Sequence, residues 1–511
     1  MVRKLRIAIV SLYALENNGV RHVASSLREV GFGVSEIYFK DWVNNNFPWP
    51  EEHEVQSLID LLRQREIEVV GFSVRASAFH RMAKYLTERI RHALPELRIL
   101  WGGMHPTFMP ELCIEIADHI AIGEVDEAVV DFFVALDEGR DVTRCRSFWT
   151  RSGGEVFRND LAPLVDMDAL PFRDFHTQED KFHIEGSSVE VGDPFITNPE
   201  YTVLASRGCP YWTCTFCSNT VTKPLYQGLG KNFRLRSVEN LIQEMEYAMT
   251  LCQNIKVVRF DDEVFPIRKV WIEELAEKWP SRVGIPFEVL VDPRMVSYES
   301  LALLKKAGLR AICMGIQAND RVNHEHYHRP VSNAQIVAAQ EVFRKVGIQS
   351  NLQLIWDDPF STEQDKDELF QMLMSLERPF ELYLFGLTIY PRTHLARTLL
   401  REGVITEDDI EGVNTHAFEQ FRVDLGYPRS AEDRRWLGLI VLMNKGVLPK
   451  SFIWKLYNSQ RFKDNPDTLI AFAQVVNLFK MAHVASQMTL RGEMTPLLLK
   501  RWVNPKSLVT M

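Results

Sequence analysis

Three cysteines that lie within nine residues of one another are the first side chains of this sequence whose type and spacing suggest a chemistry. Cys209, Cys214 and Cys217 follow directly after a strand that we expect at 201–206. Three thiolates this close on a loop can ligate three irons of a cubane cluster, and a fourth cysteine would complete an electron-transfer ferredoxin site. No fourth cysteine follows within reach of the motif. The spacing therefore predicts an iron–sulfur cluster with one iron left open to bind a substrate.

Two structural alternatives compete with this interpretation. The loop could be a zinc knuckle that lacks one ligand, although no His or Cys lies nearby at the spacing of a zinc finger. The three thiols could also be incidental. The chain has seven cysteines, and an odd number in a large protein does not indicate a disulfide framework.

The composition limits the class of protein. Of 511 residues, 46% are hydrophobic and 25% are charged, the balance of a soluble globular protein. The net charge of −9 and the lack of a basic stripe argue against a nucleic-acid partner. No uninterrupted apolar run approaches the length of about 20 residues that spans a bilayer, and the N-terminus lacks the apolar stretch of a signal peptide. We therefore expect no membrane span and a cytoplasmic location.

The N-terminal part of the chain alternates short apolar runs with amphipathic helices. Strands are expected at 6–10, 33–38, 68–73, 98–101 and 119–122. Five consecutive β-α units predict an α/β domain over 1–145, with a parallel sheet in flavodoxin-like, Rossmann-type strand order. Ligands of such sheets bind beyond the carboxyl ends of the strands. In this chain those ends carry residues 11–19, 73–77, 102–107 and 123–124.

The remaining chain divides into three further segments. Residues 146–196 are irregular apart from a hairpin turn at 151–154, and we interpret them as a linker. Over 197–425 a second β-α series has expected strands at 201–206, 255–260, 286–291, 310–316, 350–356 and 381–390. Six such units predict a partial (β/α)6 barrel of the TIM type, whose chemistry belongs at the carboxyl ends of its strands. Residues 426–511 show a helical pattern only and predict a helical C-terminal domain.

The cysteine loop at the end of the first barrel strand resembles that of the radical SAM superfamily. The resemblance includes the aromatic Phe216 directly before Cys217. It implies a [4Fe-4S] cluster whose open iron binds S-adenosylmethionine (SAM) and whose electron cleaves it to a 5′-deoxyadenosyl radical. One departure is clear, because four residues separate Cys209 from Cys214 where the usual spacing is three. Variants with four are known in the superfamily.

Further SAM contacts are implied by the same resemblance, at the ends of later barrel strands. Phe216 is expected near the adenine, and Asp262 follows the second strand, where the family places groups that meet the methionine amino end. Arg294, after the third strand, is a candidate for the SAM carboxylate, and Gln317 ends the fourth strand. The structural alternative for Asp262 is the N-cap of a helix.

The N-terminal domain resembles the cobalamin-binding domain of cobalamin-dependent radical SAM enzymes. The resemblance rests on the glycine turns at 102–107 and 123–128, since glycine lets the backbone approach a ligand closely. It implies cobalamin contacts by Ser73, Ser77, Gly102, Gly103, His105, Thr107, Gly123 and Glu124. The loop at 11–19 has no histidine to bind cobalt from below. Cobalamin would then bind without a protein histidine ligand, or the domain is degenerate and binds nothing.

Taken together, these resemblances imply a radical enzyme that methylates an unactivated carbon of a small molecule. Cyclisation, oxidation or rearrangement without methyl transfer is the alternative outcome, and a binding module without catalysis is a third. Cys113 and Cys145 do not supply the second cysteine set of a methylthiotransferase. Tyr211, Trp212 and Tyr390 are candidates for the substrate site. An electron donor such as flavodoxin or ferredoxin is expected as a partner, and no residue is predicted as a catalytic acid or base.

Overall fold

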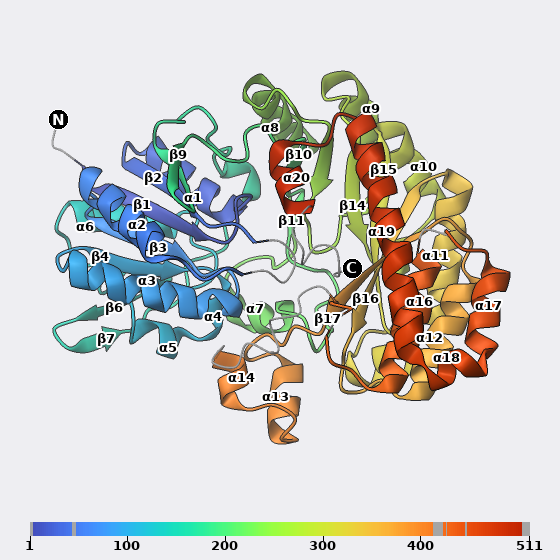
Figure 1. The fold of residues 1–511 in the computed structure, drawn as a ribbon. Coiled ribbons are helices and arrows are strands. Elements are labelled where there is room, and N and C mark those ends of the chain that lie inside the picture. The colour runs from blue at the N-terminus through green and yellow to red at the C-terminus, as the bar shows by residue number, and fades with distance from the viewer. Residues whose placement is uncertain (1–3, 43–46, 412–422, 426, 445–446, 503–511) are drawn as a thin grey trace.

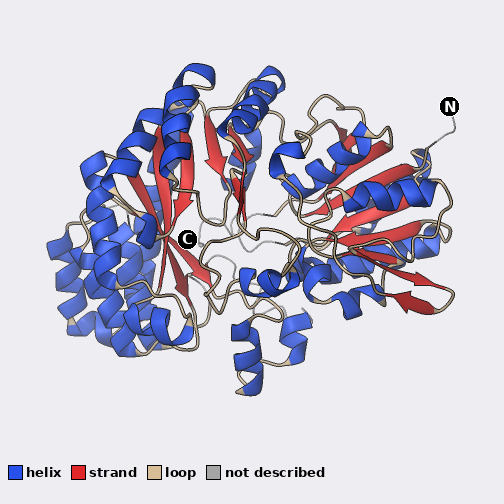
Figure 2. Ribbon diagram, turned by 180° about the vertical axis from the view of Figure 1, so that it is seen from behind, coloured by secondary structure: helices blue, strands red, loops and turns tan. Residues whose placement is uncertain are grey.

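The computed structural model describes residues 4–42, 47–411, 423–425, 427–444 and 447–502. Two α/β units lie side by side, and their sheets face a common region between them (Figure 1). The N-terminal unit is built on a nine-stranded sheet and the second unit on a six-stranded sheet. In Figure 2 helices cover the outer side of the six-stranded sheet and both faces of the nine-stranded sheet.

The N-terminal sheet confirms the predicted flavodoxin-like order. Its parallel core has the strand order β5-β4-β3-β1-β2, and each strand overlaps the range expected from the sequence. The core elements are β1 (Arg6–Leu12), α1 (Asn18–Glu29), β2 (Gly33–Phe39), α2 (Glu52–Gln64), β3 (Val69–Ser73), α3 (His80–Ala93), β4 (Arg98–Gly102), β5 (His119–Ala121) and α6 (Ala128–Asp137). Near-continuous burial along β1 and β2 is typical of parallel strands with both faces covered. This arrangement brings the carboxyl ends of β1, β3, β4 and β5 to one edge.

The segment 146–196, predicted as a linker, completes this sheet at both edges. The expected hairpin forms from β6 (Phe148–Ser152) and β7 (Glu155–Phe157), and β6 pairs antiparallel with β5. At the other edge β8 (Lys181–Glu185) pairs parallel with β2 and antiparallel with β9 (Ser188–Val191). The prediction missed β8 and β9 although both strands alternate polar and apolar residues, because each strand is short and carries only two apolar residues.

The second unit is the predicted partial barrel. Its six strands are parallel and follow one another in chain order. They are β10 (Glu200–Val203), β13 (Val257–Phe260), β14 (Phe287–Val291), β15 (Leu309–Gln317), β16 (Gln349–Trp356) and β17 (Glu381–Gly386). The helices are α7 (Asn219–Leu225), α8 (Val238–Leu251), α9 (Lys269–Arg282), α10 (Tyr298–Ala307), α11 (Asn333–Val346), α12 (Glu363–Ser375), α13 (His394–Arg401) and α14 (Glu407–Glu411). Ser237, Ser297, Ser332 and Thr362 each cap the N-terminus of the following helix with a side-chain oxygen.

The C-terminal segment is helical, as predicted, but it shares one apolar core with the barrel. Its helices are α16 (Ala431–Met443), α17 (Lys450–Asn458), α18 (Gln460–Asp464), α19 (Pro466–Leu490) and α20 (Pro496–Trp502). Trp436 and Leu469 are buried in the same cluster as the barrel residues Leu352 and Phe370. Helices α16, α17 and α19 are therefore a further layer of the barrel unit, whereas α20 pairs with Asp41 and Glu185 of the N-terminal unit.

Helix α19 bears on the expectation that no segment spans a membrane. Among the described residues it is the one helix long and apolar enough to cross a bilayer by length and composition, and 28% of its most apolar window is buried. The sequence analysis missed it because Gln474, Asn477 and Lys480 interrupt the apolar run. Leu469, Ile470 and Ala473 pack into the core, whereas most of the window is not buried, and length and composition alone assign no span.

Candidate active site between the two domains

The three predicted cluster ligands lie on the loop between β11 (Ser206–Arg207) and α7. Cys209, Cys214 and Cys217 are partly buried and form no disulfide. Burial, together with the nearby thiols of Cys214 and Cys209, raises the pKa of the Cys217 thiol to about 12. The effect of both thiols on Cys217 indicates that the three side chains are neighbours on this loop. Thiolates so placed are stabilised by cationic iron, so the residues present fit a three-cysteine cluster.

Backbone geometry fixes the start of the cysteine loop. Gly208, directly before Cys209, has φ of 88°, and a Cβ there would lie 2.2 Å from the carbonyl oxygen of Asn232. No side chain fits at this position. Trp212 adopts a left-handed φ of 56° within the four-residue spacing that departs from the family pattern. The extra residue is therefore accommodated in a turn between Cys209 and Cys214.

Thr215 fixes the second half of the loop. Its amide donates to the Tyr327 carbonyl oxygen (3.0 Å), and its hydroxyl donates to that of His326 (2.6 Å). Its own carbonyl accepts from the Leu395 amide at the start of α13 (3.0 Å). Phe216, the predicted adenine contact, packs edge-on against Tyr327 with ring centroids 4.9 Å apart. The barrel thus holds the loop through hydrogen bonds of Thr215, directly after Cys214.

Asp262 supports the loop from below. Its buried carboxylate accepts hydrogen bonds from the amides of Ala205 and Ser206 and from the Ser206 hydroxyl. Burial raises the pKa of this carboxyl to about 7. Its alternative role as a helix N-cap is wrong, because the next helix begins only at Lys269. The predicted contact between Asp262 and SAM stays a prediction, while the contacts in the structure make it a positioning residue for the cysteine loop.

Asp292, Arg294 and Arg329 form a charged group near the cysteine loop. They lie in the segments that follow β14 and β15. Asp292 accepts hydrogen bonds from Arg294 Nε (2.7 Å) and from Arg329 Nη2 (2.9 Å). The Arg294 guanidinium lies 3.4 Å above the ring centre of Tyr211 on the cysteine loop. Both arginines lower the pKa of the Cys214 thiol, against the larger raising effect of its burial. Two cations therefore lie close to the expected cluster.

Arg329 is the residue that the sequence analysis missed here. Its Nη2 also donates to the Gly315 carbonyl oxygen (2.6 Å), while its buried Nη1 has no hydrogen-bond partner among the described residues. A buried guanidinium with a spare donor fits a carboxylate ligand such as that of SAM. Gln317 lies beside it, with φ of 62° and its amide folded over Gly315. Nothing in the local sequence distinguishes Arg329 from an ordinary loop arginine.

The carboxyl edge of the N-terminal sheet is shaped by glycine turns, as predicted. Gly103 has φ of 106°, and a Cβ there would lie 3.0 Å from the Val74 carbonyl group. Gly123 has φ of 74°, and a Cβ there would meet the Tyr226 hydroxyl at 2.9 Å. The Thr107 hydroxyl joins the two turns, because it donates to Gly103 O (2.8 Å) and accepts from Gly123 N (2.9 Å). Such close-packed backbone fits the approach of a large flat ligand.

The other predicted cobalamin residues divide into two groups. Gly102 ends β4 at this edge, and Ser73 ends β3 with its hydroxyl bonded to Asn17. Ser77 bonds instead to His105, whose ring is 1% exposed and points into the domain. A direct cobalamin contact by the His105 side chain is therefore not supported. The sequence could not show this, because a histidine in a glycine turn faces either way.

Glu124 connects the two domains. Its carboxylate pairs with Arg207 (2.7 Å) and Arg234 (2.6 Å) of the barrel unit, and its amide donates to the Tyr226 hydroxyl (2.9 Å). Arg207, two residues before Cys209, also pairs with Asp126 (2.6 Å). The sequence analysis did not predict these ion pairs, which hold the start of the cysteine loop against the predicted cobalamin edge.

The candidate substrate residues lie around this junction. The Tyr390 pKa is raised by burial and by the nearby Cys217, and lowered by Arg75 of the N-terminal domain. Tyr390 is therefore near Cys217 and Arg75, and Tyr211 and Trp212 belong to the loop itself. A cavity of about 570 Å³ opens next to the cysteine loop, and none of these three residues belongs to its lining. Its lining comes from both domains: Thr107, Thr213, Thr215, Thr220, Val221, Pro224, Leu225, His328, Arg392, His394 and Arg397.

Comparisons with known proteins agree with this architecture. Residues 6–133 match the B12 binding domain family, and residues 203–373 match the radical SAM superfamily. The anaerobic magnesium-protoporphyrin IX monomethyl ester cyclase of Rubrivivax gelatinosus is 22% identical, over 69% of this chain and 61% of its own length. The hopanoid C-3 methylase of Methylococcus capsulatus is 23% identical, over 68% and 62%. The chain thus spans about three fifths of the length of these relatives.

A solved structure shows the same fold over nearly the whole chain. The cobalamin-dependent SAM radical enzyme OxsB, with aqua-cobalamin and SAM bound, matches with a TM-score of 0.64 and 14% identity, over 99% of this chain and 85% of its own. The two matched families follow each other in the order of the two α/β units described above, and each match lies within one unit. The chain therefore belongs to the radical SAM enzymes with an N-terminal cobalamin-binding domain, and its cofactors are a [4Fe-4S] cluster, SAM and cobalamin.

Proposed function

We propose that this chain is a cobalamin-dependent radical SAM methyltransferase that methylates an unactivated carbon of a small molecule. The observation that carries the proposal is the ionic contact of Arg207 with Glu124 and Asp126. This contact holds the cysteine loop of one domain against the glycine edge of the other. A substrate between the two edges would meet both cofactors at once.

The cofactors, when bound, would supply the radical that removes a hydrogen atom and the methyl group that replaces it. The chain's own residues bind and orient them. Cys209, Cys214 and Cys217 would hold the cluster, and Arg329 and Arg294 would pair with the SAM carboxylate, with Phe216 near its adenine. The turns at Gly103 and Gly123 would hold cobalamin.

The cavity beside the cysteine loop is the proposed substrate site. It is lined by both domains, with Thr107 on the cobalamin side and Thr213 and Thr215 on the cluster side. Its volume of about 570 Å³ lies in the range of small-molecule sites, roughly 300–1,000 Å³. Tyr211, Trp212 and Tyr390 are proposed to close it toward the cofactors.

Radical cyclisation without methyl transfer is the second candidate. It is favoured by the match to the cyclase of Rubrivivax gelatinosus, whereas the match to the hopanoid C-3 methylase favours methyl transfer. A degenerate N-terminal domain is disfavoured, because Gly103, Thr107 and Gly123 keep the close-packed backbone of a ligand edge. An electron donor such as flavodoxin or ferredoxin and a cytoplasmic location remain part of the proposal.

The experiment is anaerobic reconstitution with iron, sulfide and cobalamin, followed by SAM labelled in its methyl group and a chemical reductant. We expect 5′-deoxyadenosine to form and the label to transfer to protein-bound cobalamin. 5′-Deoxyadenosine without labelled cobalamin would favour the cyclase candidate. An intact cluster that yields no 5′-deoxyadenosine would overturn the catalytic proposal itself.

A further inference from the structure

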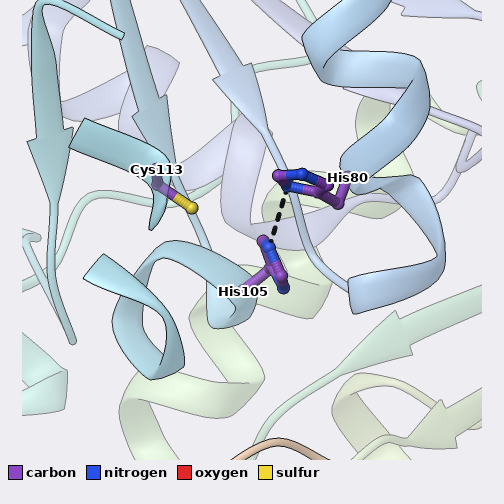
Figure 3. Close-up of side chains that lie close together, drawn as sticks. All are labelled: His80, His105 and Cys113. Carbon is purple, nitrogen blue, oxygen red and sulfur yellow. Dashed lines mark hydrogen bonds between the residues drawn. The ribbon is translucent and has the colours of Figure 1, made fainter. Parts of the chain in front are cut away.

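Three side chains with metal-binding atoms converge inside the N-terminal domain, apart from the cysteine loop (Figure 3). They are His80 at the start of α3, His105 in the short helix α4 (Met104–Phe108) and Cys113 in α5 (Pro110–Ile114). One ligand atom from each lies within 4.8 Å of the other two. His80 is 6% exposed, His105 1% and Cys113 0%.

The distances suit a single ion. Zinc binds nitrogen at about 2.0–2.1 Å and sulfur at about 2.3 Å in tetrahedral geometry, so two of its ligand atoms lie roughly 3.3–3.6 Å apart. His105 Nε2 and His80 Nδ1 are 3.0 Å apart and share a hydrogen bond. Figure 3 shows the Cys113 sulfur pointing toward this pair. Two imidazoles and a thiolate form a ligand set that zinc prefers.

The surrounding residues fix the orientation of the ligands. The His105 Nδ1 atom hydrogen-bonds to the Ser77 hydroxyl at 3.0 Å. Such a partner on the remote nitrogen is typical of metal-bound histidine, because it fixes the tautomer and the ring plane. The His80 ring packs edge-on against Trp101, with centroids 5.8 Å apart. Neither ring is free to turn away.

The main chain also holds the ligands in place. The His105 amide donates to the Val74 carbonyl oxygen (3.1 Å), which connects α4 to the end of β3. The Met109 amide donates to His105 O (2.8 Å), and the Cys113 amide to Met109 O (3.1 Å). His105 and Cys113 therefore lie at fixed positions on one continuous α4–α5 segment, without help from a bound ligand.

We propose that His80 Nδ1, His105 Nε2 and Cys113 Sγ bind one Zn²⁺ ion. Binding replaces the hydrogen bond between the imidazoles, which stay neutral by carrying their protons on the opposite nitrogens. The Cys113 thiol releases one proton and binds as thiolate. The ion would join α3 to the segment that follows the Gly102–Gly103 turn, and so stabilise the cobalamin edge from behind.

The protonation of these groups is consistent with the proposal. Burial lowers the pKa of His80 to about 4 and that of His105 to about 3. Both imidazoles are therefore neutral near pH 7, the form that binds metals. Burial raises the pKa of the Cys113 thiol, so without a metal this site holds a neutral thiol.

The test is the zinc content of the full-length protein carrying its iron–sulfur cluster, so that Cys209, Cys214 and Cys217 are already occupied. After equilibration with Zn²⁺ and dialysis, we expect one zinc per chain. Cys113→Ser and His105→Gln should each lose it, with the iron content unchanged. Cys145→Ser, a change of a partly exposed cysteine outside both sites, should keep it. No zinc in the native protein, or equal zinc in Cys113→Ser, would overturn the proposal.

A spectroscopic measurement keeps the test independent of how the variants fold. Zinc X-ray absorption of the native protein should show one sulfur and two imidazole ligands. Three sulfur ligands would instead place the ion in a cluster-free cysteine loop and would also overturn the proposal. Neither readout involves SAM cleavage or methyl transfer. The proposal of a zinc site can therefore be disproved without affecting the proposed activity, and the reverse also holds.

Discussion

The two cofactor edges of this molecule are built by different means. At the barrel edge the chemistry lies in side chains: three thiols on one loop, faced by Arg294, Arg329 and Asp292. At the edge of the N-terminal sheet it lies in the backbone, where Gly103 and Gly123 adopt left-handed φ values. A cluster and a charged sulfonium need ligand atoms and counter-charges, whereas a large neutral macrocycle needs a surface that side chains leave clear. Substitutions at the barrel edge should therefore impair the cluster and SAM, and substitutions at the other edge should impair cobalamin binding.

The largest effect is expected at the barrel edge. Cys214→Ala removes one of three cluster ligands, and the same holds for Cys209→Ala and Cys217→Ala. Each should abolish cluster iron and 5′-deoxyadenosine formation while cobalamin uptake is retained. Iron content, deoxyadenosine yield and corrin absorbance check this, with Cys145→Ser as the matched control. A full cluster in all three variants would show that these cysteines are not the cluster ligands.

At the edge of the N-terminal sheet we expect loss of cobalamin binding with the cluster retained. In Gly103→Ala the new Cβ would lie 3.0 Å from the Val74 main chain at φ of 106°. We expect cobalamin affinity to fall by tenfold or more, about 1.4 kcal/mol, with cluster and deoxyadenosine formation unchanged. Gly139→Ala is the control, since its φ is 66° and nothing lies within 4 Å of the added Cβ. Equal cobalamin binding in both variants would show that this turn is not part of the site.

A change in the KM for SAM should separate the two arginines. Arg329→Lys keeps the charge but loses the second guanidinium nitrogen, and a charge-assisted hydrogen bond contributes about 1.5–3 kcal/mol. We expect the KM for SAM to rise by about 10- to 100-fold with a smaller change in kcat, and Arg294→Lys to do less. A fall in kcat at constant KM would instead indicate that Arg329 only supports the Asp292 and Gly315 contacts.

The smallest effect is expected at the contact between the edges. Asp126→Asn removes one of the two carboxylates that pair with Arg207, and Glu124 remains. We expect a loss of about 1–3 kcal/mol in the free energy of unfolding and a lower ratio of methyl transfer to deoxyadenosine. Denaturant unfolding and product ratios measure both. An unchanged ratio would show that this ion pair does not set the distance between cofactors.

The same contact has a predictable pH dependence. Burial alone would raise the pKa of Asp126, but the guanidinium of Arg207 lowers it below 3.8. A carboxyl whose pKa is lower in the folded state stabilises the protein above its unfolded pKa and loses this contribution as the pH falls through the folded value. The difference in unfolding free energy between native protein and Asp126→Asn should therefore be full at pH 7 and shrink below about pH 4.

The sequence by itself determined the two units, their strand order and the position of the cysteine loop. These features depend on local information: the period of apolar residues along each strand or helix, and three cysteines within one loop. It also located the turns at Gly103 and Gly123, because glycine has few rivals where φ is positive. Local periodicity did not reveal β8 and β9, since each strand has only two apolar residues, too few to stand out in an irregular segment.

Only the tertiary structure decided which distant residues meet. Arg207 and Asp126 are 81 residues apart in the chain, yet they pair at the junction of the domains. Arg329 faces the cysteine loop with one nitrogen that has no hydrogen-bond partner in the described part of the chain, and His80, His105 and Cys113 converge from three helices. None of these residues is unusual in its own segment. Their roles follow from the packing of separate elements, which brings their polar atoms together away from water.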